Sequence, residues 1–274
     1  MRLAIDHRLT LTAPAGPFQS VFHLLLTPPN GPTQSVERWD IDMAGFETAG
    51  RFVDGFGNVA HLVNQPRSED EVTIHVRGTV STRDTHGVIG RPAGEPVPAL
   101  YRRLTTATKA PPALVATFRG TKESRVDVLH SLMARVGDML GLPDETPAQT
   151  QMQADGGQSQ SQTTEQKTLP AAADYAHLFI GAARALDIPA RFVTGYRLNE
   201  TNETNETNES AVLHAWAEAF DDRLGWIGFD PQRQMCPTDA YVRLAVGLDA
   251  EMATVLRTVP AAEPVQLLTV SRAE

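Results

Sequence analysis

A histidine and an aspartate in the last quarter of the chain could together perform acid–base chemistry. His214 opens an alternating apolar run and Asp230 closes the next one, with the turn-forming stretch 221–225 between them. This pattern predicts two antiparallel strands joined by a short turn. One register puts His214 directly opposite Asp230, and a second, in which Phe220 faces Trp226, puts them on a diagonal. Both registers keep the two side chains on one face, where a carboxylate fixes the tautomer of an imidazole and stabilises its protonated form.

A pair of this kind becomes the base of a catalytic triad when a nucleophile lies beside it. The best-suited nucleophile is a thiol at a helix N-terminus, where the helix dipole lowers the thiol pKa and backbone N–H groups can bind an oxyanion. Residues 171–186 are predicted to form a helix, because Tyr175, Phe179 and Ala182 fall on one face of a helical period. The first turn of that helix reads Ala171-Ala172-Ala173, so it offers no thiol.

Other side chains are poor substitutes for this nucleophile. Cys236 is the only cysteine, and it lies before Pro237 in a loop, so we interpret it as a packed, unreactive thiol. The serines and threonines of residues 159–168 precede the helix within a stretch rich in Gln and Ser. A hydroxyl needs close placement against its base, and such a stretch is a weak platform for it.

The elements that must position the pair are three strands and the helix. Strands are predicted at 190–198, 213–220 and 226–230, following the helix at 171–186. Before them, residues 1–90 alternate apolar and polar residues in short runs, which predicts a sandwich-like β domain. We therefore divide the chain into a β domain (1–90), a connector with helices (91–148), a polar low-complexity loop (149–170), and a core with C-terminal strands (171–274).

Four longer motifs make the pattern specific. They are, in chain order, Asp174-Tyr175-Ala176-His177, Ile188-Pro189-Ala190-Arg191-Phe192-Val193-Thr194-Gly195-Tyr196, His214-Ala215-Trp216-Ala217-Glu218, and Gly228-Phe229-Asp230-Pro231. This series resembles the transglutaminase-like superfamily of papain-like cysteine hydrolases. The first ninety residues, with the turn at Phe56-Gly57-Asn58, resemble the β domain that precedes the core in bacterial members. The resemblance implies an α+β fold, in which a helix packs on an antiparallel sheet behind a β-sandwich-like N-terminal domain.

The resemblance also assigns roles to particular residues. His214 matches the catalytic histidine of the family and Asp230 its orienting aspartate. Ala172 stands where the family has its nucleophilic cysteine, two residues before Asp174, and the glycine that normally leads into that cysteine is absent. Asp174 and Trp216 are expected to line the ligand-binding cleft. Bacterial members are often encoded near amide-forming ligases, which implies a possible association with such enzymes.

Composition restricts the partners further. The formal net charge is −9, which disfavours a nucleic-acid backbone or an anionic membrane as a partner. No run of apolar residues approaches the roughly 18 needed to cross a bilayer, and the cytoplasm is the expected location. One cysteine cannot form an internal disulfide, and no His, Cys or carboxylate set has the spacing of a metal site, so we expect no metal and no cofactor.

Three functions are compatible with these residues. The first is a catalytically degenerate protein that binds a peptide or another amide-containing ligand in the former active-site cleft. The second is an active amide hydrolase or acyl-transfer enzyme that uses His214 and Asp230 without a cysteine. The third is a scaffold in a peptide-processing assembly, with the β domain or the acidic repeat at 199–210 contacting a partner protein.

Overall fold

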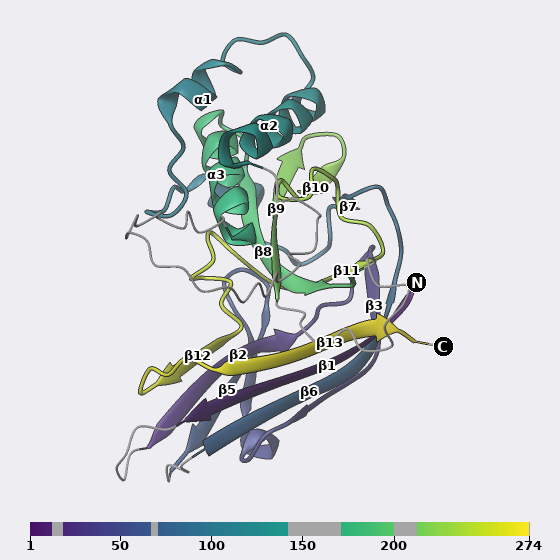
Figure 1. The fold of residues 1–274 in the computed structure, drawn as a ribbon, viewed down its shortest axis with the longest axis vertical. Helices are drawn as coiled ribbons and strands as arrows, with labels where there is room; N and C mark the ends of the chain where they lie inside the picture. Colours follow the sequence, from purple (N-terminus) through teal and green to yellow (C-terminus); the bar gives the residue numbers. More distant parts are fainter. Residues whose placement is uncertain (13–18, 67–70, 142–170, 200–212, 274) are drawn as a thin grey trace, which may run out of the picture.

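The protein has a β-sandwich at one end and a helix-covered sheet at the other (Figure 1). The structure, a computed structural model, describes residues 1–12, 19–66, 71–141, 171–199 and 213–273. The predicted polar loop at 149–170 and nearly all of the acidic repeat therefore lie outside the described residues. The α+β fold predicted from the sequence is confirmed.

The sandwich consists of two four-stranded sheets. The first has the strand order β13-β1-β6-β3 and the second β12-β2-β5-β4. Apolar residues alternate along β1, so that Leu3, Ile5 and Leu9 point inward and meet residues of the opposite sheet such as Phe22 and Leu24. The strands run over the following residues: β1 Arg2–Thr12, β2 Ser20–Thr27, β3 Gln34–Asp42, β4 Gly50–Val53, β5 Val59–Gln65, β6 Glu71–Thr82, β12 Leu256–Val259 and β13 Val265–Arg272.

A third, five-stranded sheet, which we call the core sheet, has the order β11-β8-β9-β10-β7. Its strands are β7 Val88–Gly90, β8 Ala190–Arg197, β9 His214–Asp221, β10 Gly225–Phe229 and β11 Tyr241–Gly247. The helices are α1 Pro112–Ala116, α2 Arg125–Leu140 and α3 Ala172–Ala185, with short 3₁₀ turns η1 Phe46–Thr48 and η2 Pro98–Arg102. The predicted helix and the three predicted strands of this region are all present, within two residues of their expected ends.

The two faces of the core sheet have different neighbours. Ala215, Ala217 and Ala219 of β9 share an apolar cluster with Phe179 of α3, so the small side chains let the helix lie close to the strand. Trp216, on the opposite face of β9, belongs instead to the apolar cluster of the sandwich. The alternation along one strand therefore joins the helices to one side of the core sheet and the β-sandwich to the other.

The C-terminal strands differ from the sequence-based division of the chain. Residues 171–274 were expected to form one unit, but β12 pairs with β2 and β13 pairs with β1, so both strands belong to the sandwich. Conversely, β7, inside the expected β domain, pairs with β10 of the core sheet. Strand pairing depends on contacts between distant parts of the chain, which the local apolar pattern does not record.

Two side-chain amides from the sandwich region cover the edge of β11. The Gln34 amide accepts a hydrogen bond from the Arg243 backbone N–H (2.7 Å) and donates one to the Arg243 carbonyl (2.9 Å). The Asn58 amide makes the same pair of bonds with Val246, both at 2.8 Å. Each amide supplies one donor and one acceptor, as a neighbouring strand would, so the edge of β11 is satisfied without a further strand.

Asn58→Ala should destabilise the protein, because it leaves the buried N–H and C=O of Val246 without partners. We expect a loss of about 2 to 4 kcal/mol in the free energy of unfolding, measured by urea denaturation. Asn64→Ala, at an exposed position of β5, the strand that begins directly after Asn58, is the matched control and should change stability by less than about 0.5 kcal/mol. Equal losses in the two variants would contradict the role given to Asn58.

Candidate active site: an imidazole–carboxylate pair beside a helix start

The predicted His214–Asp230 pair forms. The hairpin adopts the register in which Phe220 faces Trp226, so His214 and Asp230 lie on a diagonal. His214 Nε2 is 2.5 Å from Asp230 Oδ2, and both side chains are buried. An ionised carboxylate can only accept a hydrogen bond, so Nε2 carries the proton and donates it. In the neutral ring, Nδ1 then holds the lone pair and is the atom available to take a proton.

Asp230 is held by further donors. The same oxygen, Oδ2, accepts a hydrogen bond from the Tyr241 hydroxyl at 2.9 Å, and Oδ1 accepts one from the Arg233 backbone N–H at 3.2 Å. The backbone of Asp230 forms an isolated bridge with Met235, which folds residues 231–234 into a tight turn. A fully buried carboxylate is costly unless such bonds satisfy it, and here they also fix its orientation.

Helix α3 packs against β9 on the face formed by Ala215, Ala217 and Ala219. Ala172 is the first helical residue, and it is half-buried against the apolar cluster that contains Ala215, the neighbour of His214. Asp174 is exposed, and its carboxylate accepts a hydrogen bond from the Ala171 backbone N–H at 2.8 Å. Asp174 was expected to line the ligand cleft, but its contact is with the free N–H of its own helix, which is a capping role.

Trp216 supports the imidazole from within the core. The two rings are nearly parallel, with centroids 6.3 Å apart, and the edge of the Tyr241 ring meets the indole at 5.5 Å. Trp216 is only 3% exposed, and its place in a ligand cleft stays a prediction. Its ring occupies the space above Gly195, where an added Cβ would come within 2.5 Å of the indole. The indole belongs to the apolar cluster of the sandwich.

A ring of buried charges lies further along the same face of the core sheet. Arg191 Nε is 2.6 Å from Glu218 Oε2, and Arg191 Nη1 is 2.8 Å from Glu95 Oε2. Arg243 closes the ring, with Nη2 3.1 Å from Glu95 and Nε 3.2 Å from Glu218. The Arg191 guanidinium also lies over the Trp226 ring at 3.9 Å. Two positive and two negative groups therefore neutralise one another inside the protein.

The charges of this ring shift one another's pKa values. Burial alone would lower the pKa of Arg191, but the carboxylates of Glu218 and Glu95 raise it above its ordinary value. Burial would likewise raise the pKa of Glu95, and the guanidinium groups of Arg191 and Arg243 reverse the direction and lower it. Glu95 therefore stabilises the fold at pH values above its ordinary pKa, and this contribution disappears as the pH falls through the lowered value.

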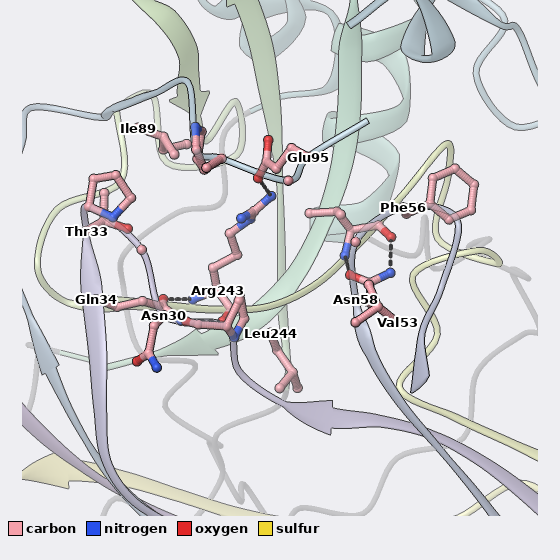
Figure 2. Close-up of a pocket in the computed structure, with 18 residues that line it drawn as sticks. Asn30, Thr33, Gln34, Val53, Phe56, Asn58, Ile89, Glu95, Arg243 and Leu244 are labelled. Atoms are coloured by element: carbon pink, nitrogen blue, oxygen red, sulfur yellow. Dashed lines mark hydrogen bonds and ion pairs between the residues drawn. The ribbon is translucent and has the colours of Figure 1, made fainter. Parts of the chain in front are cut away.

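A cavity of about 280 Å³ opens over Glu95 and Arg243, between the sandwich and the core sheet. Figure 2 shows Arg243 reaching toward Glu95, with Gln34 on one side and Asn58 on the other. Neither His214 nor Asp230 lines this cavity. Its polar side chains already bond to one another or to the backbone of β11, so we assign the cavity to the junction of the sandwich and the core sheet and not to the candidate active site.

Sequence reasoning missed Tyr241, Glu95 and the charge ring. The Arg191–Glu218 pair could have been found, because these residues occupy opposite positions in the β8–β9 register that also pairs Gly195 with His214. Tyr241 follows the eleven residues that connect β10 to β11, and no periodicity predicts where this connection returns the chain. Among the described residues, no group of three His, Cys, Asp or Glu side chains could hold a metal ion. No described helix is long and apolar enough to cross a membrane.

A helix packed on an antiparallel sheet, with a histidine and an aspartate paired across neighbouring strands, is the arrangement of papain-like cysteine hydrolases. Residues 114–231 match the Transglutaminase-like superfamily, and residues 3–81 match the Bacterial transglutaminase-like N-terminal region. Two stretches of the chain are therefore similar to a transglutaminase-like core and to a bacterial transglutaminase-like N-terminal region.

Two solved structures and one further protein are similar to all or part of this chain. A candidate cysteine protease from Cytophaga hutchinsonii, solved by crystallography, is 16% identical, with a TM-score of 0.70 over 100% of this chain and 91% of that one. The periplasmic domain of TgpA from Pseudomonas aeruginosa, bound to ethylmercury, is 15% identical over 84% of this chain and 90% of that one, with a TM-score of only 0.34. An uncharacterized protein of Mycobacterium leprae (strain TN) is 32% identical over 76 residues, which span 28% of this chain and 26% of that protein. The first similarity establishes the shared fold.

Arg191→Met should leave the charge ring with an excess of negative charge, since only the guanidinium of Arg243 then remains for Glu218 and Glu95. At pH 7 we expect the free energy of unfolding to fall by about 3 to 5 kcal/mol. The deficit should shrink as the pH drops below about 4.3, because the carboxylates of the variant then take up protons. Urea denaturation at pH 7, 5 and 4 measures this, with the exposed Arg119→Met as control. A deficit that is constant with pH would indicate lost packing instead of unbalanced charge.

Proposed function

We propose that this protein is a catalytically degenerate transglutaminase-like protein, which binds a peptide or another amide-containing ligand at the start of α3. The observation that carries the proposal is the intact, buried His214–Asp230 pair, together with a helix that packs on the same strand and whose first residue is alanine. Ala172 takes the place of the nucleophilic cysteine, so no thioester can form there. Loss of a triad nucleophile costs on the order of 10⁶ in kcat, which leaves binding as the main capacity of the site.

Cys236 does not replace the missing thiol. It lies half-buried in the turn after Asp230, close to Gly87, where an added Cβ would meet the Cys236 Cβ at 2.6 Å. Burial raises the pKa of the Cys236 thiol, so the reactive thiolate is scarce near neutral pH. A nucleophile needs the opposite environment.

Restoring a thiol tests the geometry of this proposal. In a Cys236→Ala background, Ala172→Cys should give a thiol whose pKa lies at least about one unit below 8.5, measured from the pH dependence of alkylation by iodoacetamide. Adding His214→Ala should return that pKa toward 8.5, because the imidazolium no longer stabilises the thiolate.

Ala173→Cys is the matched control for this experiment. It shares the helix N-terminus but is one residue along the turn, so His214→Ala should leave its thiol pKa unchanged. The proposal fails if the Ala172→Cys thiol is insensitive to His214→Ala, because Ala172 would then not occupy the position of the nucleophile.

The 2.5 Å contact between His214 and Asp230 also favours a second function, amide hydrolysis in which His214 activates water directly. One titration separates the two functions. A blocked glutaminyl-glycine peptide is added to the protein while the His214 ring resonance and the release of ammonia are followed together.

Under the main proposal the His214 resonance shifts as the peptide saturates the site and no ammonia appears. Under the second, ammonia is released with a bell-shaped dependence on pH and the release is lost in His214→Ala. The surface variant His75→Ala serves as control and should match the parent in both measurements. An unmoved His214 resonance with no ammonia at any peptide concentration would reject both functions.

A further inference from the structure

The oxygen of Asp230 that binds His214 also binds a second side chain. Tyr241, the first residue of β11, donates its hydroxyl to Asp230 Oδ2 at 2.9 Å, while His214 Nε2 lies 2.5 Å from the same atom. The edge of the Tyr241 ring faces the His214 ring, with centroids 5.9 Å apart. Two hydrogen bonds therefore join the imidazole on β9, the carboxylate that follows β10, and the phenol on β11.

Tyr241 is placed with little freedom. Its backbone pairs with Arg197 of β8, and its ring packs edge-on against Trp216. The ring is buried, so the hydroxyl has no bulk water to exchange with. Burial, reinforced by the charge of Asp230, raises the pKa of Tyr241 well above its ordinary value, which keeps the phenol protonated and able to donate at all working pH values. Arg197 and Arg233 are the other charged groups that act on it.

We propose that Tyr241 is a positioning residue of this site, whose hydroxyl withdraws charge from Asp230 and so weakens the stabilisation that this carboxylate gives to a protonated His214 imidazole. Two donors share one carboxylate oxygen. Each hydrogen bond from Tyr241 stabilises the ionised carboxylate and reduces the negative charge left to stabilise a protonated imidazole. A neutral ring has a free lone pair on Nδ1, which is the form that can accept a hydrogen bond from a ligand amide.

This inference rests on the proposed function only in taking His214 as the ligand-facing group, and its test needs no ligand. Tyr241→Phe keeps the ring and removes the hydroxyl. Because Asp230 then keeps more of its charge, the pKa of His214 should rise by about one unit, measured from the NMR titration of the ring Cε1–H resonance. His214→Ala identifies that resonance among the eight histidines.

Tyr196→Phe is the matched control. Tyr196 is equally buried and its hydroxyl lies 3.3 Å from Nδ1 of a different histidine, His7. The pKa of His7 is lowered by burial to about 4. Removing the Tyr196 hydroxyl should affect the His7 resonance and leave the titration of His214 unchanged.

A second background separates charge withdrawal from packing. In Asp230→Asn there is no carboxylate charge to share, so adding Tyr241→Phe should move the His214 pKa by less than about 0.3 units. A His214 pKa that is the same in the parent and in Tyr241→Phe would overturn the inference, as would a shift that persists in full in the Asp230→Asn background. Either result can be obtained whether or not the protein binds a peptide, so failure here is distinct from failure of the proposed function.

Discussion

Asp230 is a carboxylate with no exposed surface, and the free energy lost by removing its charge from water must be recovered from hydrogen bonds. The β10 strand ends one residue earlier, which brings Asp230 into the turn where the backbone N–H of Arg233 can reach it. The hairpin register then presents His214, and β11 presents Tyr241. The hairpin, the turn and β11 must all be in place before this one charge is satisfied, so the site is specified by the buried carboxylate.

Much of what makes the sequence look transglutaminase-like performs structural work in this fold. Arg191 and Glu218, which belong to two of the motifs, make the shortest ion pair of the charge ring, at 2.6 Å. Gly195 provides the space for the Trp216 indole, which in turn stacks against His214. These residues hold the core sheet against the sandwich whether or not a nucleophile is present. The fold itself therefore requires these motif residues.

The sequence was most informative where a structure is determined by neighbouring residues. The α3 helix, the strands β8 to β10 and the His214–Asp230 pair all follow from local periodicity and from the geometry of a hairpin. The contact of Tyr241 with Asp230 does not, since it depends on the path of the intervening loop. The capping role of Asp174 was visible in its charge at a helix start, but the family resemblance favoured a ligand role. The pairing of β12 and β13 with β2 and β1 joins opposite ends of the chain, and no short-range pattern encodes it.

That last pairing has a consequence for how the protein is made. Leu3 of β1 faces Arg272 of β13 in the antiparallel register, and between them the chain forms the entire core sheet and its helices (Figure 1). As the ribosome synthesises the chain from its N-terminus, β1 and β2 emerge long before their partners β13 and β12. Each of them keeps one unpaired edge until β13 and β12 have been synthesised, and such edges are the usual starting points of aggregation. The sandwich is therefore open to wrong strand pairing for as long as these two strands are missing.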